Sequence, residues 1–135
     1  MKIRTLILGG LAAATSVLAP NAFAHHSYAM FAEDKVMTVQ GTVSRFDWTN
    51  PHGWIHVMVT DEKTKQPVRW SIETGAPGGM ARQGWLPKTI GPGDKISITF
   101  HPLRNGQPGG SYMAATLPNG KVMGNPNPRP GAIGD

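Results

Sequence analysis

The stretch of sequence that decides the fold is VMTVQGTVSRFDW, residues 36–48. It is a long run rich in β-branched and aromatic side chains, which favour β-strands. Gly41 interrupts the run near its middle, and a glycine inside a strand often marks a bulge or a sharp bend. We therefore expect one long, bent strand that takes part in both halves of a small barrel.

The chain after this stretch carries the pattern of several shorter strands. In residues 53–60, Ile55, Val57 and Val59 point to one side, while the residues between them point to the other. The apolar side is expected to face the core. Similar runs predict three more strands, at residues 68–73, 95–101 and 111–117.

Residues 74–85 have a different character and predict a short helix of about two turns. Pro77 suits a first helical turn, and Gly84 suits the end of a helix. The order of elements is typical of an all-β fold, a small five-stranded OB-like Greek-key barrel with one short helix between strands 3 and 4. An open β-sandwich is the alternative.

The first 24 residues read as a secretory signal peptide. Lys2 and Arg4 form a basic start, residues 6–17 form a short apolar core, and Ala22-Phe23-Ala24 is a small-residue cleavage site. We expect a periplasmic or secreted protein after cleavage near Ala24. The expected organisation is a signal peptide at residues 1–24, a segment with a histidine pair at 25–35, the barrel at 36–123 and a disordered Pro/Gly-rich tail at 124–135.

Composition narrows the classes of partner. The chain has no cysteine, which excludes a disulfide and a lipid-modified cysteine. The formal net charge is +5, and loss of Lys2 and Arg4 with the signal leaves +3. The basic residues are scattered, so we expect no nucleic-acid partner. No later stretch is long and apolar enough to span a membrane.

Several separated motifs resemble a known family. They are HHSYAMF at residues 25–31, WTNPH at 48–52, Gly84-Trp85, and Pro92-Gly93-Asp94. Together they resemble a family of small exported bacterial proteins classed as a domain of unknown function, and the resemblance covers roughly residues 24–123. It implies export and a single compact β-domain. It implies no activity and no catalytic residues.

The predicted cleavage would place His25 at the mature N-terminus, followed by His26. An α-amine and an imidazole on one residue form a chelate that suits Cu(II). His52 and His56 are the candidates for a further ligand, so copper is the expected cofactor if there is one. Cleavage one residue earlier would instead place a histidine third, a pattern that binds square-planar Cu(II) or Ni(II). The simpler alternative is a solvated N-terminus, with His52 as a turn residue.

A second candidate site lies on the predicted solvent side of the second and third strands. Trp54, Arg69 and Glu73 are expected there, on the face that OB-folds commonly use for ligands. Such a face could dock a peptide, a glycan or a membrane-protein partner. The alternative is that the N-terminal segment covers Trp54.

Evidence for an enzyme is weaker. Ser27 lies near histidines, but no nucleophile, zinc-protease or phosphate-binding motif is present. Asp47 and Glu73 could pair as acid and base, although nothing in their spacing requires it. A copper-dependent oxidase is a third possibility. The favoured interpretation is a small exported binding protein without turnover, with an unidentified exported or membrane-associated protein or a small ligand as its partner.

Overall fold

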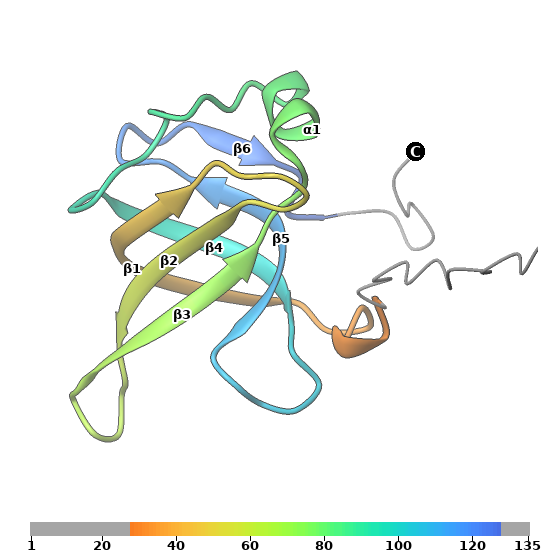
Figure 1. Cartoon of the computed structure of the whole chain (residues 1–135). Coiled ribbons are helices and arrows are strands. Elements are labelled where there is room, and N and C mark those ends of the chain that lie inside the picture. Colours follow the sequence, from red (N-terminus) through yellow and green to blue (C-terminus); the bar gives the residue numbers. More distant parts are fainter. Residues whose placement is uncertain (1–27, 128–135) are drawn as a thin grey trace, which may run out of the picture.

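The computed structural model describes residues 28–127. The elements follow one another along the chain as η1 (Tyr28–Met30), β1 (Met37–Asp47), β2 (Trp54–Thr60), β3 (Pro67–Glu73), α1 (Pro77–Arg82), β4 (Lys95–Pro102), β5 (Gly109–Thr116) and β6 (Val122–Gly124). Figure 1 shows the strands wrapped around one core, with α1 above one end of the sheet.

The sheet closes into a barrel. Its strand order is β3-β2-β1-β4-β5-β6, and an additional pairing joins β3 to β5. That closing pair is parallel and runs from Ser71–Gly109 to Glu73–Ser111, whereas the other pairs are antiparallel. The prediction of an all-β, OB-like five-stranded barrel with a short helix between strands 3 and 4 is confirmed, and the open sandwich is wrong.

β1 joins the two halves of the barrel, as its length and its glycine predicted. Its first half pairs with β4 as far as Thr42, and from Thr42 onward it pairs with β2. At Gly41 a side chain would lie 2.5 Å from the carbonyl oxygen of Met58, so β2 crosses this point closely. The register shift comes slightly later, between Val43 and Arg45. Gly41 therefore permits the close crossing, and Ser44 lies at the bulge.

α1 is shorter than expected but begins and ends where the sequence indicated. Pro77 occupies the first turn, and Gly84 follows the C-cap with a φ of 90°. The Gly84 N–H donates to the carbonyl of Ala81 at 2.9 Å, and the Trp85 N–H donates to that of Met80 at 3.0 Å. This paired ending satisfies the last carbonyls of the helix and turns the chain inward. It delivers Trp85, which is fully buried, into the core.

The core consists of the inward-facing side chains of the strands, together with Met80 and Trp85. The largest fully buried side chains are Trp85, Phe100, Ile55, Ile72, Met80, Ile98, Val43 and Val57. The predicted inward side of β2 is thus confirmed for Ile55 and Val57, while Val59 is partly buried. The Trp85 indole N–H donates to the hydroxyl of Tyr112 at 3.1 Å, and that hydroxyl donates to the carbonyl of Met123 at 3.0 Å. Burial raises the pKa of Tyr112 to about 12.

β6 was not predicted. It forms a hairpin with β5 through the turn at Gly120, whose N–H donates to the carbonyl of Leu117 at 2.9 Å. The strand ends at Gly124, and the Asn125 N–H donates to the carbonyl of Met113 at 3.0 Å. The first residues of the expected disordered tail are therefore paired with the barrel, and residues 128–135 lie outside the described part.

The segment before β1 is attached to the barrel rather than extended from it. Phe31 forms an isolated bridge with Leu103 and is buried, and the Ala32 N–H donates to the carbonyl of Pro102 at 2.8 Å. Arg104 donates from its backbone N–H to the carbonyl of Met30 at 2.9 Å. The predicted signal peptide and both histidines of the pair fall outside the described residues. Within residues 28–127, no helix is long and apolar enough to cross a membrane.

Candidate functional site

The outer face of β1, β2 and β3 gathers most of the chemistry-bearing side chains that the sequence singled out. Strand register places them in two rows. The first row contains Asp47, Trp54 and Glu73, and the second contains Arg45, His56 and Ser71. We call these six residues the outer-face cluster.

A chain of hydrogen bonds crosses the second row. The Nδ1 atom of His56 lies 2.9 Å from the Ser71 hydroxyl, and its Nε2 atom lies 3.2 Å from Oδ2 of Asp47. Arg45 donates to the same carboxylate oxygen from Nε at 3.1 Å and from Nη2 at 2.7 Å. The His56 side chain is only 12% exposed. Both of its ring nitrogens therefore have protein partners, and its orientation is fixed.

His52 is held by a different carboxylate. Its Nδ1 atom lies 3.3 Å from Oε1 of Glu73, whose side chain is 10% exposed while that of His52 is 38% exposed. The Thr49 hydroxyl donates to the backbone carbonyl of His52 at 2.9 Å, which closes the β1–β2 turn around the cis peptide bond before Pro51. His52 is thus a positioned side chain at the surface.

The prediction that Glu73 faces solvent is wrong. Alternation correctly places it on the outer side of β3, but the β1–β2 connection folds over it. The Gly53 N–H donates to the carbonyl of Gly75 at 3.3 Å, and the Thr74 N–H donates to that of Gly53 at 2.9 Å. These bonds continue the β2–β3 pairing past the end of β3 and bury Glu73 beneath the turn. Glu73 is therefore shielded from solvent and paired with His52.

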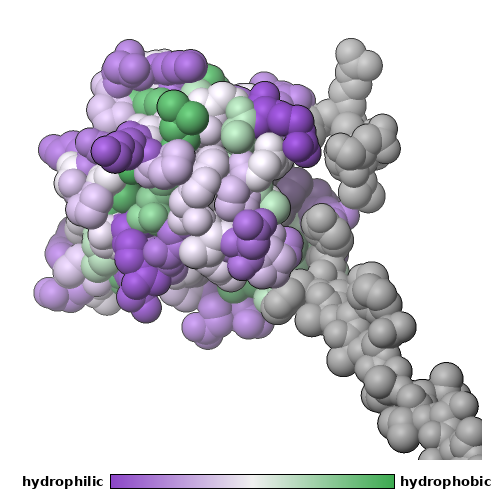
Figure 2. All heavy atoms as spheres, turned by 45° about the horizontal axis from the view of Figure 1, so that its top comes forward, coloured by the Kyte–Doolittle hydropathy of each residue, from purple (hydrophilic) through white to green (hydrophobic). Residues whose placement is uncertain are grey.

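Trp54 and Arg69 do lie at the surface. Trp54 is partly buried, and its ring is nearly parallel to that of His56, with an angle of 12° and 6.4 Å between centroids. Arg69 is exposed and faces the same way as Ser71, two residues further along β3. Within residues 28–127, the Arg69 side chain makes no hydrogen bond or ion pair. Figure 2 shows a largely hydrophilic surface with small hydrophobic areas.

The predicted metal ligands are only partly covered by the structure. His52 and His56 both lie at the outer side of β2 or the turn before it, while His25 and His26 are outside the described residues. Among residues 28–127, no group of three or more His, Asp or Glu side chains is arranged to hold a metal ion. A complete site would need ligands from the N-terminal pair.

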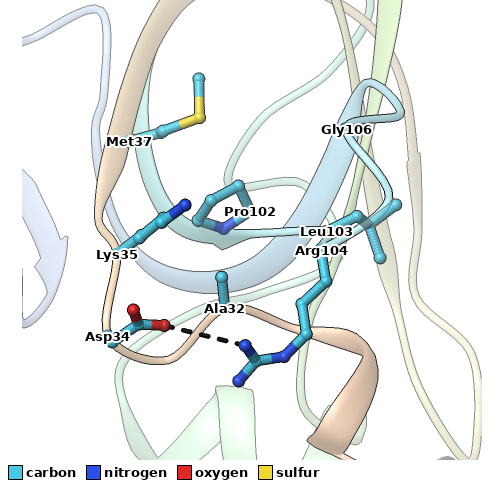
Figure 3. A pocket seen from close by; sticks show the side chains of 8 residues that line it. All are labelled: Ala32, Asp34, Lys35, Met37, Pro102, Leu103, Arg104 and Gly106. Carbon is cyan, nitrogen blue, oxygen red and sulfur yellow. Dashed lines mark ion pairs between the residues drawn. The ribbon is translucent and has the colours of Figure 1, made fainter.

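An open hollow of about 360 Å³ lies where the N-terminal segment meets the β4–β5 connection. Figure 3 shows Ala32 at its floor, with Lys35 and Met37 on one side and Arg104 on the other. Arg104 and Asp34 are 4.0 Å apart and both well exposed, so their ion pair contributes little to stability. The hollow is formed where the N-terminal segment packs on the β4–β5 connection, and its lining residues do not form a cluster of catalytic groups.

The link between Asp47, His56 and Ser71 was missed by sequence reasoning. Asp47 was considered only as a possible partner of Glu73, and each of these carboxylates is in fact paired with a histidine. The alternation of β2 and β3 places His56 and Ser71 on one face, but only the register places them opposite each other. The bulge in β1 then sets which residue of that strand reaches His56.

Comparisons with known proteins identify the family of this chain. Among solved structures, the chain is similar to the mitochondrial single-stranded DNA binding protein Rim1 of S. cerevisiae, with a TM-score of 0.47 and 10% identity over 62% of this chain and 92% of that one. A likeness at this level carries no argument about function. Curated protein sequences gave no match. A family model matches residues 13–112, and on that evidence the chain belongs to DUF6152, a family of unknown function.

Proposed function

We propose that this chain is an exported protein that is cleaved after Ala24 and binds copper through its new N-terminus. The ligands are the α-amine and imidazole of His25, with His26 and His52 completing the set. Amine and imidazole nitrogens are the ligands that Cu(II) prefers. The protein then acts as a binding protein of the periplasm or the cell exterior.

The observation that carries the proposal is the pairing of His52 with buried Glu73. Histidines that bind metals commonly donate their other ring N–H to a carboxylate, which fixes the ring and raises its basicity. When Nδ1 of His52 donates to Glu73, the lone pair of the neutral ring is on Nε2. His52 therefore has the supporting contact that a metal-binding histidine needs.

The attachment of the N-terminal segment gives further support. Phe31 and Ala32 are buried against the β4–β5 connection, so the chain just after the histidine pair is held on the barrel. His25 is three residues from Tyr28, a reach of at most about 11 Å.

His56 is a further candidate ligand, but binding a metal through its ring would break an existing hydrogen bond. Both ring nitrogens already lie within hydrogen-bonding distance of Ser71 and Asp47. A metal at either nitrogen would displace one of these partners. His56 therefore stays a further candidate beside His25, His26 and His52.

A competition titration tests the proposal. Chain beginning at His25 is titrated with Cu(II) against a chelator of known affinity, beside its His25→Ala, His52→Ala and Glu62→Ala variants. We expect one tight equivalent, a large loss of affinity in the first two variants and no change in the third. Glu62 is the control because it is exposed in the β2–β3 turn, away from the outer-face cluster. Equal affinity in all four proteins would contradict the proposal.

A second candidate function uses the same face without a metal. Arg69 is exposed and makes no ion pair within the described residues, and it faces the same side of the sheet as the partly exposed Trp54 ring, with the His56–Ser71 pair between them. Such a surface fits an interaction module that docks a peptide, a glycan or a membrane protein. Loss of a captured partner with Trp54→Ala, but not with His25→Ala, would favour this candidate.

A further inference from the structure

We propose that Ser71 is a nucleophile activated by His56, and that the outer face thereby carries an acyl-transfer activity toward short esters. The proposal rests on the hydrogen-bond chain from Ser71 through His56 to Asp47. It uses neither the N-terminal histidines nor a metal.

The contacts of His56 determine which of its nitrogens carries the proton. Asp47 is a carboxylate that only accepts hydrogen bonds, so Nε2 of His56 donates to it across 3.2 Å. The neutral ring then has its lone pair on Nδ1, and Nδ1 lies 2.9 Å from the Ser71 hydroxyl. The hydroxyl donates to that lone pair. This is the arrangement in which a histidine acts as the general base for a serine.

Asp47 and Arg45 are positioning residues for the base. Arg45 holds Oδ2 of Asp47 with two donors, at 3.1 and 2.7 Å, and this oxygen is the one that faces His56. Rotation of the imidazole would break its contact to Asp47. The surrounding residues also restrict this rotation, since the His56 side chain is only 12% exposed. Serine, base and orienting carboxylate are thus present in the functional order found in nucleophilic enzymes, with the two ring nitrogens exchanged.

The surroundings suit a small acyl group. Ser71 is partly exposed, so an external ester can approach it. Arg69 lies on the same side of β3 and has no partner among residues 28–127, which leaves its guanidinium available for a developing oxyanion. The Trp54 ring, nearly parallel to that of His56, offers an apolar surface for a short acyl chain.

The Ser71 oxygen attacks the ester carbonyl carbon, and its proton passes to Nδ1 of His56. The bond from that carbon to the leaving oxygen breaks, and His56 returns the proton to the departing alkoxide. Water then attacks the acyl-serine with the same base, releasing the carboxylic acid and regenerating the Ser71 hydroxyl.

Labelling with a fluorophosphonate tests the nucleophile. In this reaction the serine oxygen bonds to phosphorus, fluoride leaves, and the serine proton is lost to the base. The mature chain is treated with EDTA so that no metal supplies a nucleophile, and the adduct is located by tandem mass spectrometry. We expect one adduct on Ser71, none on the Ser71→Ala variant, and at least tenfold slower labelling of His56→Gln. Ser97→Ala, a matched change on the outer side of β4, should label at the parental rate.

Asp47→Asn separates positioning from simple support of the fold. The amide keeps the size of the side chain but can donate to His56, which favours the wrong ring tautomer. We expect at least tenfold slower labelling across pH 6–9, with an unchanged thermal unfolding midpoint. No adduct on Ser71, or equal labelling of the parent and His56→Gln, would overturn the proposal and leave the network a purely structural one.

Discussion

The described histidines differ in the group that holds each ring. His52 pairs with the buried carboxylate of Glu73, His56 lies between a hydroxyl and a carboxylate, and His101 donates to a backbone carbonyl. These contacts decide which ring nitrogen is protonated, and therefore what each histidine can do. We propose His52 as a metal ligand and His56 as a base, while His101 helps to attach the segment before β1.

Replacement of Glu73 by Gln tests the supporting role of that residue for copper. The amide keeps the shape but removes the negative charge beside Nδ1 of His52. We expect copper affinity to fall roughly ten- to a hundredfold, as is typical when such a supporting partner is removed. Glu62→Gln, in the exposed β2–β3 turn, is the matched control. Unchanged affinity in Glu73→Gln would remove His52 from the ligand set.

Because Tyr112 is buried in its protonated form, we expect the folded chain to lose stability in alkaline solution. Its pKa is raised from 10.0 to about 12 by burial, so the unfolded chain loses this proton at a lower pH than the folded chain. The stabilisation is complete below pH 10 and declines as pH rises from 10 to 12, by an amount on the order of 2 kcal/mol. Urea unfolding at pH 8 to 12 should show this decline in the parent relative to Tyr112→Phe. Parallel pH profiles would contradict it.

At the scale of elements, β1 is the strand that makes a barrel possible. It pairs with β4 and then with β2, and the change occurs within one residue of Gly41. Any side chain at Gly41 would meet the carbonyl oxygen of Met58 and the side chain of Val59. β1 can therefore pair with both β4 and β2 because residue 41 is a glycine and has no Cβ.

Gly41→Ala should destabilise the barrel by about 1–3 kcal/mol, as expected for a group forced into a closely packed site. Gly91→Ala is the matched control, because a Cβ there would contact nothing within 4 Å. Chemical denaturation of both variants gives the comparison. An equal, small effect of the two substitutions would show that β2 does not approach β1 closely at this point.

The elements could largely be predicted from local patterns, whereas the contacts of the site could not. Alternation located five strands, and the pair Pro77 and Gly84 bracketed the helix, because these signals act within a few residues. β6 was missed because it is only three residues long, too short to show an alternating pattern. The burial of Glu73 depends on a loop distant in sequence, and the Ser71–His56 contact depends on register between strands. Neither is a local property of the chain.

At the scale of the whole molecule, the closed barrel provides a rigid outer face and an attached N-terminal segment. Parallel pairing of β3 with β5 places Ser71 opposite Gly109, and the connection before Gly109 is the one that binds residues 30–32. The segment that follows the histidine pair is therefore linked, through a few backbone hydrogen bonds, to the strand that carries Glu73 and Ser71. This connectivity is what makes a shared site of N-terminus and barrel reasonable.

The most direct test of the account is made on one sample of the exported protein, purified from the periplasmic fraction of expressing cells. Intact mass identifies its first residue, and titration with Cu(II) against a competing chelator then measures binding by that same sample. We expect a chain that begins at His25 and binds one tight equivalent of copper. A chain that begins elsewhere, or one that begins at His25 and takes up copper only weakly and without defined stoichiometry, would contradict it.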